Sequence, residues 1–209
     1  VITQACQAAL DGGIRVQDAF EFMEQVSGRY DLPFLFMSYF NIAFAYRQEA
    51  SGGRGGADGV AGFVAASAAA GASGLILPDL PPDMVREGYK EACDKAALHP
   101  VYVVSPNTGK ERLELIAEAG SGLLYATSRT GTTGKEMDLE MQELTGFLAS
   151  ARETCGMPIA VGFSISTREQ VEALGGHADI AVVGTHFIRV WEEGGTAALE
   201  AELNKLTGS

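Results

Sequence analysis

The stretch "HPVYVVSPNTGKERLELIAEAGSGLLYATS", residues 99–128, reads as a strand, a helix and a second strand in that order. Both ends are short runs of apolar and β-branched residues, as in parallel strands that are buried on both faces. Thr108 and Glu111 have the spacing of a capping box that would begin the helix, and Gly120 can end it. The apolar face expected for this helix comprises Leu113, Leu115, Ile116 and Ala119.

The same alternation extends in both directions from this stretch. Further strand-like runs occur at 32–39, 74–80, 157–164 and 179–185. Ser166 and Glu169 repeat the capping-box spacing after the run at 157–164. Helices between parallel strands form right-handed βα units, which occur in open doubly wound sheets and in (β/α)₈ barrels.

Two features favour the barrel over the open sheet. No GxGxxG motif follows the first strand, which weakens a dinucleotide-binding interpretation. Polar residues and glycines cluster directly after the strands, and in a barrel these loops share the face that carries the active site. We predict an α/β (β/α)₈ TIM barrel, about six of whose βα units are present, in a single partial domain over residues 1–209.

One segment departs from the alternation. Residues 47–62, "RQEASGGRGGADGVAG", are rich in glycine, mixed in charge and without apolar periodicity. They are predicted to form a mobile inserted loop.

Composition excludes several functional classes. The 209 residues carry a formal charge of −12, which disfavours binding to nucleic acid. No apolar run is long enough to span a bilayer, and a cytoplasmic location is predicted. Three widely spaced cysteines and three scattered histidines predict neither a disulfide framework nor a metal site.

The segment "ATSRTGTTGKEM", residues 126–137, looks like a phosphate-binding loop but does not fit a Walker motif. Arg129 stands where the first glycine is required, and Glu136 follows Lys135 where serine or threonine is required. The loops after the last two strands fit a phosphomonoester site better, with Ser164, Gly184 and Thr185 as donors. The "TTG" at 132–134 could close over the same ligand.

Proton transfer requires an acid or base at a strand end, and Asp79 in "LPDLPP" is the clearest candidate. A capping or turn aspartate explains the same pattern, and both alternatives stay open. Tyr125 could point into the barrel mouth or fill the core, with the core as the default.

Several segments together resemble the α subunit of tryptophan synthase, from residue 1 to the end of the chain. The most specific are "YATSRTGTTG" and "LPDLPP", and "PFLFMSYFNIAF", "PIAVGFSIS" and "VVGT" also match. The resemblance implies a lyase of tryptophan biosynthesis that cleaves indole-3-glycerol phosphate to indole and glyceraldehyde 3-phosphate by a retro-aldol reaction. It implies no cofactor in this chain and an α2β2 complex with a β subunit that contains pyridoxal phosphate.

Roles carried over from the family concern binding. Gly134, Ser164, Gly184 and Thr185 would hold the phosphate, and Tyr125 and Phe163 would line the indole and glycerol pocket. Thr133 would lie in the closing loop, which Arg129 would support. Tyr39 and Asn41 would lie near the β subunit, and Asp79 would be structural or adjacent to the substrate.

Three departures from the family pattern lead to further expectations. Ser164 replaces a glycine of the usual GFGIS motif. The glycine-rich segment is longer than usual, and this extra length predicts altered docking of the β subunit. The family's catalytic glutamate and aspartate are expected upstream of Val1, so no catalytic residue is assigned and little lyase activity is expected from this chain alone. One alternative is a non-catalytic phosphate-binding remnant that binds or activates a β subunit. Another is a different phosphate-binding barrel, which is disfavoured because the catalytic residues of those enzymes have no counterparts in this chain.

Overall fold

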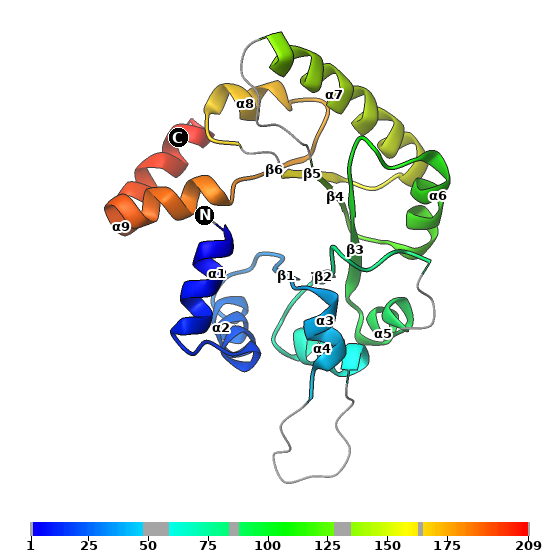
Figure 1. Cartoon of the computed structure of the whole chain (residues 1–209), viewed down its shortest axis with the longest axis vertical. Coiled ribbons are helices and arrows are strands. Elements are labelled where there is room, and N and C mark those ends of the chain that lie inside the picture. The colour runs from blue at the N-terminus through cyan, green and yellow to red at the C-terminus, as the bar shows by residue number, and fades with distance from the viewer. Residues whose placement is uncertain (1, 48–58, 84–87, 128–134, 163–164, 209) are drawn as a thin grey trace. The chain divides into compact units, whose positions relative to one another are not determined.

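The computed structural model describes residues 2–47, 59–83, 88–127, 135–162 and 165–208 (Figure 1). Six strands in these residues form a sheet in the order β1-β2-β3-β4-β5-β6. They are β1 (Leu35–Met37), β2 (Gly74–Ile76), β3 (His99–Val104), β4 (Leu124–Thr127), β5 (Ile159–Gly162) and β6 (Ile180–Val182). Each lies within a predicted run, and the β1–β2, β2–β3 and β5–β6 pairs are parallel. Sequential parallel strands that alternate with helices confirm the predicted α/β barrel class.

Two compact units divide the chain. The first unit comprises Val1–Gly12, Val104–Thr108 and Tyr125–Ser209, and the second comprises Gly13–Val103 and Gly109–Leu124. The prediction of a single barrel domain stays a prediction.

The second unit is built around the apolar helix α4. Its helices are α2 (Val16–Ser27), α3 (Phe40–Ala45), α4 (Gly59–Ala69), α5 (Tyr89–Ala96) and α6 (Lys110–Ala119). Helix α4 packs against α2, α3, α5 and β2. Because it is apolar all round, it is buried on several sides, as Phe63 and Val64 show. The ring of Phe63 contacts Phe20 and Tyr46 at centroid distances of 5.4 and 5.7 Å, which ties α2 and α3 to this helix.

The first unit combines β4, β5 and β6 with long helices. Its helices are α1 (Ile2–Asp11), α7 (Lys135–Cys155), α8 (Arg168–Ala173) and α9 (Thr185–Thr207). Leu144 and Leu148 of α7 are fully buried, as are Ile159 and Val161 of β5. Burial of such side chains contributes about 1.5–3 kcal/mol each, so these apolar residues hold the strands in place.

Both predicted capping boxes are wrong: α6 begins without one, and the box of α8 lies one residue later than predicted. The Thr108 hydroxyl accepts a hydrogen bond from Ser105 N–H (2.9 Å), which leaves Gly109 as the N-cap of α6. At α8 the box is formed by Thr167 and Gln170, whose side-chain oxygens accept from each other's backbone N–H groups. Leu115, which was predicted to face the core, is exposed, whereas Leu113 and Ile116 are buried.

The predicted loop at 47–62 is shorter at its C-terminal end than its composition indicates. Helix α4 begins at Gly59, because the sequence from that residue on can bury an apolar surface. Residues 48–58 lie outside the described part of the chain. Among the described helices, none is both long and apolar enough to span a membrane.

Candidate functional site

Tyr125 lies on the half-buried face of β4. Leu124 and Ala126 are fully buried, and Tyr125 and Thr127 alternate with them on the other face. The Thr127 hydroxyl donates to the Val104 carbonyl (3.3 Å), whereas Tyr125 has no hydrogen bond to another described residue. Burial raises the pKa of Tyr125, so its phenol stays protonated near neutral pH and can both donate and accept a hydrogen bond.

Gly162 ends β5 next to the hydroxyl end of the Tyr125 side chain. A Cβ at this position would lie 2.7 Å from Tyr125 Cζ and closer still to the hydroxyl oxygen. Only glycine permits this approach without displacing the ring, because real Cβ atoms are not found so close to other heavy atoms. The pair therefore places the Tyr125 hydroxyl at the carboxyl end of β5, where the active sites of barrels lie.

The beginning of α9 lies at the same end of the neighbouring strand. In the parallel β5–β6 pair, Gly162 is opposite Val182, and Gly184 follows two residues later as the N-cap of α9. A Cβ at Gly184 would have no heavy atom within 4 Å, so the described residues leave space above this backbone. The first N–H groups of a helix have no partner within the helix, and they favour anions. Gly184 and Thr185 therefore lie at the start of a helix, and their predicted contact with a phosphate stays a prediction.

A side-chain pair supports this start of α9. His186 Nε2 and Glu202 Oε1 are 3.0 Å apart, and Lys205 Nζ lies 3.2 Å from the same oxygen. The helix bends at Gly195, where φ is +64°, so residues before and after the bend can face each other. The hydrogen bond with His186 is the main cause that lowers the pKa of Glu202, and Lys205 adds to it.

The amino ends of β5 and β6 carry a different cluster. Asp179 Oδ2 accepts hydrogen bonds from Ile159 N–H and from Arg152 Nη2, both at 2.8 Å. These two hydrogen bonds hold the pKa of Asp179 below its usual range, and the bond from Ile159 N–H contributes more than the bond from Arg152. Sequence reasoning missed this cluster, because an Arg and an Asp 27 positions apart form no recognisable motif.

Three predicted residues of the second unit lie at α3. Asp79 Oδ1 accepts a hydrogen bond from Phe40 N–H (2.8 Å), which satisfies one of the unpaired donors in the first turn of α3. This contact agrees with the structural alternative for Asp79. Tyr39 is the N-cap of α3 and is 63% exposed, and Asn41 in the first turn is also exposed.

The remaining predicted site residues lie outside the described part of the chain. They are Arg129, Thr133, Gly134, Phe163 and Ser164. Their roles stay predictions. Within the described residues, no cluster of three or more His, Cys, Asp or Glu side chains could hold a metal ion.

Comparisons with known proteins agree on one family. The family model for the tryptophan synthase alpha chain matches residues 1–207. The tryptophan synthase alpha chain of Syntrophotalea carbinolica is 41% identical over 206 residues, which are 99% of this chain and 76% of that protein.

Solved structures show the same relationship. A mutant tryptophan synthase α subunit from the hyperthermophile Pyrococcus furiosus has a TM-score of 0.82 at 28% identity, over 100% of this chain and 80% of that one. A chain of the tryptophan synthase complex from the same organism has a TM-score of 0.81 at 27% identity, over 100% and 79% of the two chains. This chain belongs to the tryptophan synthase alpha chain family, whose members cleave indole-3-glycerol phosphate.

Proposed function

We propose that this chain acts as a tryptophan synthase α-type lyase, on indole-3-glycerol phosphate in tryptophan biosynthesis. The observation that carries the proposal is the arrangement at the carboxyl ends of β4, β5 and β6. A protonated phenol lies over Gly162, and the open start of α9 follows the strand paired with β5. This arrangement offers a phenol that can hydrogen-bond a ligand, and N–H groups at the start of α9 that can bind a phosphate.

The residues of this chain would bind and orient the substrate. Gly184 and Thr185 would contact the phosphate through the first turn of α9, with Ser164 and Gly134 as further contacts. Tyr125 and Phe163 would line the indole and glycerol pocket. Thr133 would belong to the loop that closes over the ligand, and Arg129 would support that loop. We assign the proton transfers of the retro-aldol reaction to none of the described residues.

The family supports a partnership with a β subunit. A solved relative is a tryptophan synthase complex. We propose that this chain joins a β subunit in an α2β2 complex through a face that includes Tyr39 and Asn41, whose exposed positions leave them accessible. Pyridoxal phosphate would be bound by that partner, this chain would use no cofactor, and the complex would be cytoplasmic. Altered docking through residues 47–62 stays a prediction.

Substrate binding and turnover test the proposal separately. The chain is titrated with a non-cleavable indole alkyl phosphate, and indole and glyceraldehyde 3-phosphate are measured after addition of indole-3-glycerol phosphate, with and without a β subunit. Saturable binding together with equal amounts of both products supports the lyase. Binding without product under either condition would favour the non-catalytic, phosphate-binding alternative, and absence of binding would contradict both.

Replacement of Tyr125 by Phe identifies the site in the same assay. The variant removes one hydroxyl and keeps the ring, so binding should weaken about threefold to tenfold if the hydroxyl contacts the ligand. Tyr30→Phe is the matched control, because Tyr30 is an exposed tyrosine of the second unit. An equal effect of both changes would contradict a role for Tyr125.

A further inference from the structure

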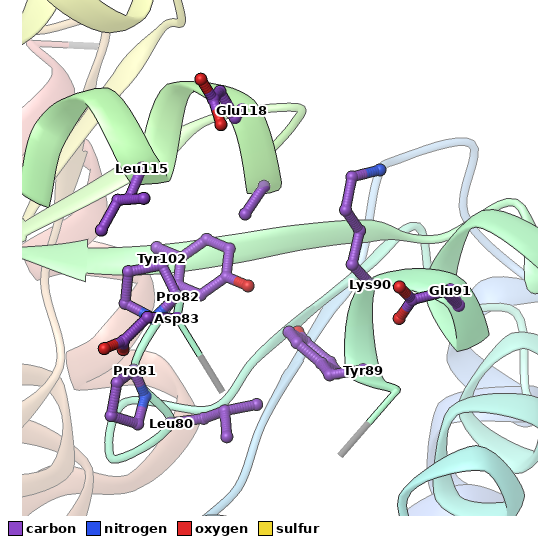
Figure 2. Close-up of a pocket in the computed structure, with 11 residues that line it drawn as sticks. Leu80, Pro81, Pro82, Asp83, Tyr89, Lys90, Glu91, Tyr102, Leu115 and Glu118 are labelled. Carbon is purple, nitrogen blue, oxygen red and sulfur yellow. The ribbon is translucent and has the colours of Figure 1, made fainter. Parts of the chain in front are cut away.

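A cavity of about 330 Å³ lies in the second unit, between α5, α6 and the segment that follows β2 (Figure 2). Its volume is at the lower end of the range for small-molecule sites. Leu80, Pro81 and Pro82 line one side, Tyr89 of α5 and Leu115 of α6 line others, and Tyr102 of β3 lies among them (Figure 2). This part of the wall is therefore mostly apolar and rich in rings that can stack against a planar group.

Tyr102 brings a buried polar group to this cavity. The residue is only 5% exposed, and its hydroxyl has no hydrogen bond to another described residue. Its neighbour Tyr89 differs, because the Tyr89 hydroxyl donates to the Leu75 carbonyl (2.7 Å). A buried hydroxyl without a partner costs free energy, which a ligand atom in the cavity would recover.

Protonation of Tyr102 keeps this hydroxyl available as a donor. Burial raises the pKa of Tyr102 to about 12, with smaller contributions from Cys93 and the Glu91 carboxylate. The phenol is therefore neutral across the physiological range, and it can both donate and accept a hydrogen bond.

The charges around the cavity are mainly negative. Asp83, Glu91 and Glu118 line it, and none of them forms an ion pair with another described residue. Lys90 also lines it, but its ammonium group is paired with Asp94 at 2.7 Å, and its side chain extends away from Tyr102 in Figure 2. The local field therefore favours a cation over an anion.

We propose that this cavity binds a small aromatic amine, a planar ring that carries an alkylammonium group. The ring would stack between the proline and tyrosine side chains, and the ammonium group would interact with the carboxylates and the tyrosine faces. The Tyr102 hydroxyl would hydrogen-bond a polar atom of the ring. The proposal does not depend on the proposed function, because none of these residues belongs to the site around Tyr125.

Calorimetric or NMR titration with tryptamine tests this proposal. Tryptamine combines an indole ring with an ethylammonium group, and a dissociation constant on the order of 1 mM is expected for a ligand of this size. Indole lacks the charge, and indole-3-propionate reverses it, so both should bind at least threefold more weakly. Equal affinity for indole-3-propionate, or no saturable binding of tryptamine, would overturn the proposal.

Matched variants locate the binding site. Glu118→Gln should weaken tryptamine binding about threefold, since partly exposed charge pairs contribute modestly. Glu114→Gln removes the same charge one helical turn earlier, where the carboxylate lies 3.9 Å from Lys110 and lines no part of this cavity, so it should have no effect. Tyr102→Phe should weaken binding about threefold to tenfold and leave the fold intact. Equal affinities for Glu118→Gln and Glu114→Gln, together with an unchanged affinity for Tyr102→Phe, would place binding elsewhere and overturn the proposal.

Discussion

The two ends of the β5–β6 strand pair use polar groups in opposite ways. At the amino ends, Asp179 accepts from both Ile159 N–H and Arg152, so the donors and the carboxylate there satisfy each other. At the carboxyl ends, the Tyr125 hydroxyl has no partner among the described residues, and none of these residues fills the space where a Cβ of Gly184 would lie. The hydrogen bonds at the amino ends stabilise the fold, whereas the carboxyl ends carry polar groups that have no hydrogen-bond partner among the described residues, and the proposed ligand site lies there.

The largest effect is expected from Gly162→Ala, which disturbs the carboxyl end itself. The new methyl group would collide with the Tyr125 ring, and the resulting shift should cost about 1–3 kcal/mol of unfolding free energy. Binding of the indole alkyl phosphate should weaken as well, because the phenol is displaced. Urea denaturation and ligand titration measure the two effects. Unchanged stability and binding would show that the ring is not held above Gly162.

Tyr89 and Tyr102 allow a second comparison between a hydroxyl that has a partner and one that has none among the described residues, with a smaller expected effect on the free energy of unfolding. Tyr89→Phe leaves the buried Leu75 carbonyl without its hydroxyl donor and should cost about 1–2 kcal/mol. Tyr102→Phe removes a hydroxyl without a described partner and should leave stability unchanged or slightly raised. Parallel denaturation curves decide between these outcomes. Equal losses for both variants would mean that Tyr102 is hydrogen-bonded in the folded protein.

Asp179→Asn tests how the carboxylate at the amino ends of β5 and β6 contributes to stability as the pH changes. The pKa of Asp179 is lowered in the folded state, so its contribution is present above its unfolded pKa of about 3.9 and is lost as pH falls through the folded value. The wild type should therefore exceed the variant in stability by at most about 1 kcal/mol from pH 5 to 8, with the gap closing below pH 4. Thermal unfolding across this range provides the measurement. A gap that persists unchanged at pH 2 would contradict a role for the ionised carboxylate.

Only a small effect on stability is expected from Gly184→Ala. Its φ is −111°, and its Cβ would meet no heavy atom of the other described residues within 4 Å, so stability should change by less than about 0.5 kcal/mol. Phosphate binding should nevertheless weaken, because the methyl group enters the space above the start of α9. A loss of binding without a loss of stability would distinguish the carboxyl end from the amino end. A loss of stability as large as that of Gly162→Ala would remove that distinction.

Local sequence patterns were sufficient to predict the fold. The apolar runs at 32–39 and 157–164, like the others, each contain a strand, because buried parallel strands need continuous apolar residues. The predicted ends of the helices were less accurate than the predicted strands. The N-cap of α6 is Gly109 and not the predicted Thr108, because the Thr108 hydroxyl accepts a hydrogen bond from Ser105 N–H in the preceding turn. Such competition between nearby hydrogen bonds depends on the three-dimensional path of the chain.

The sequence by itself determined the α/β class, the order of the strands and the family, together with Tyr125, Gly184 and Thr185 as candidates. These features depend on residue type and local spacing. Only the tertiary structure decided the partners: Gly162 lies next to Tyr125, Asp79 accepts a hydrogen bond from Phe40 N–H, and the buried Tyr102 hydroxyl has no hydrogen bond to another described residue. Each of these depends on which segments, distant along the chain, meet in space, and neither periodicity nor composition contains that information.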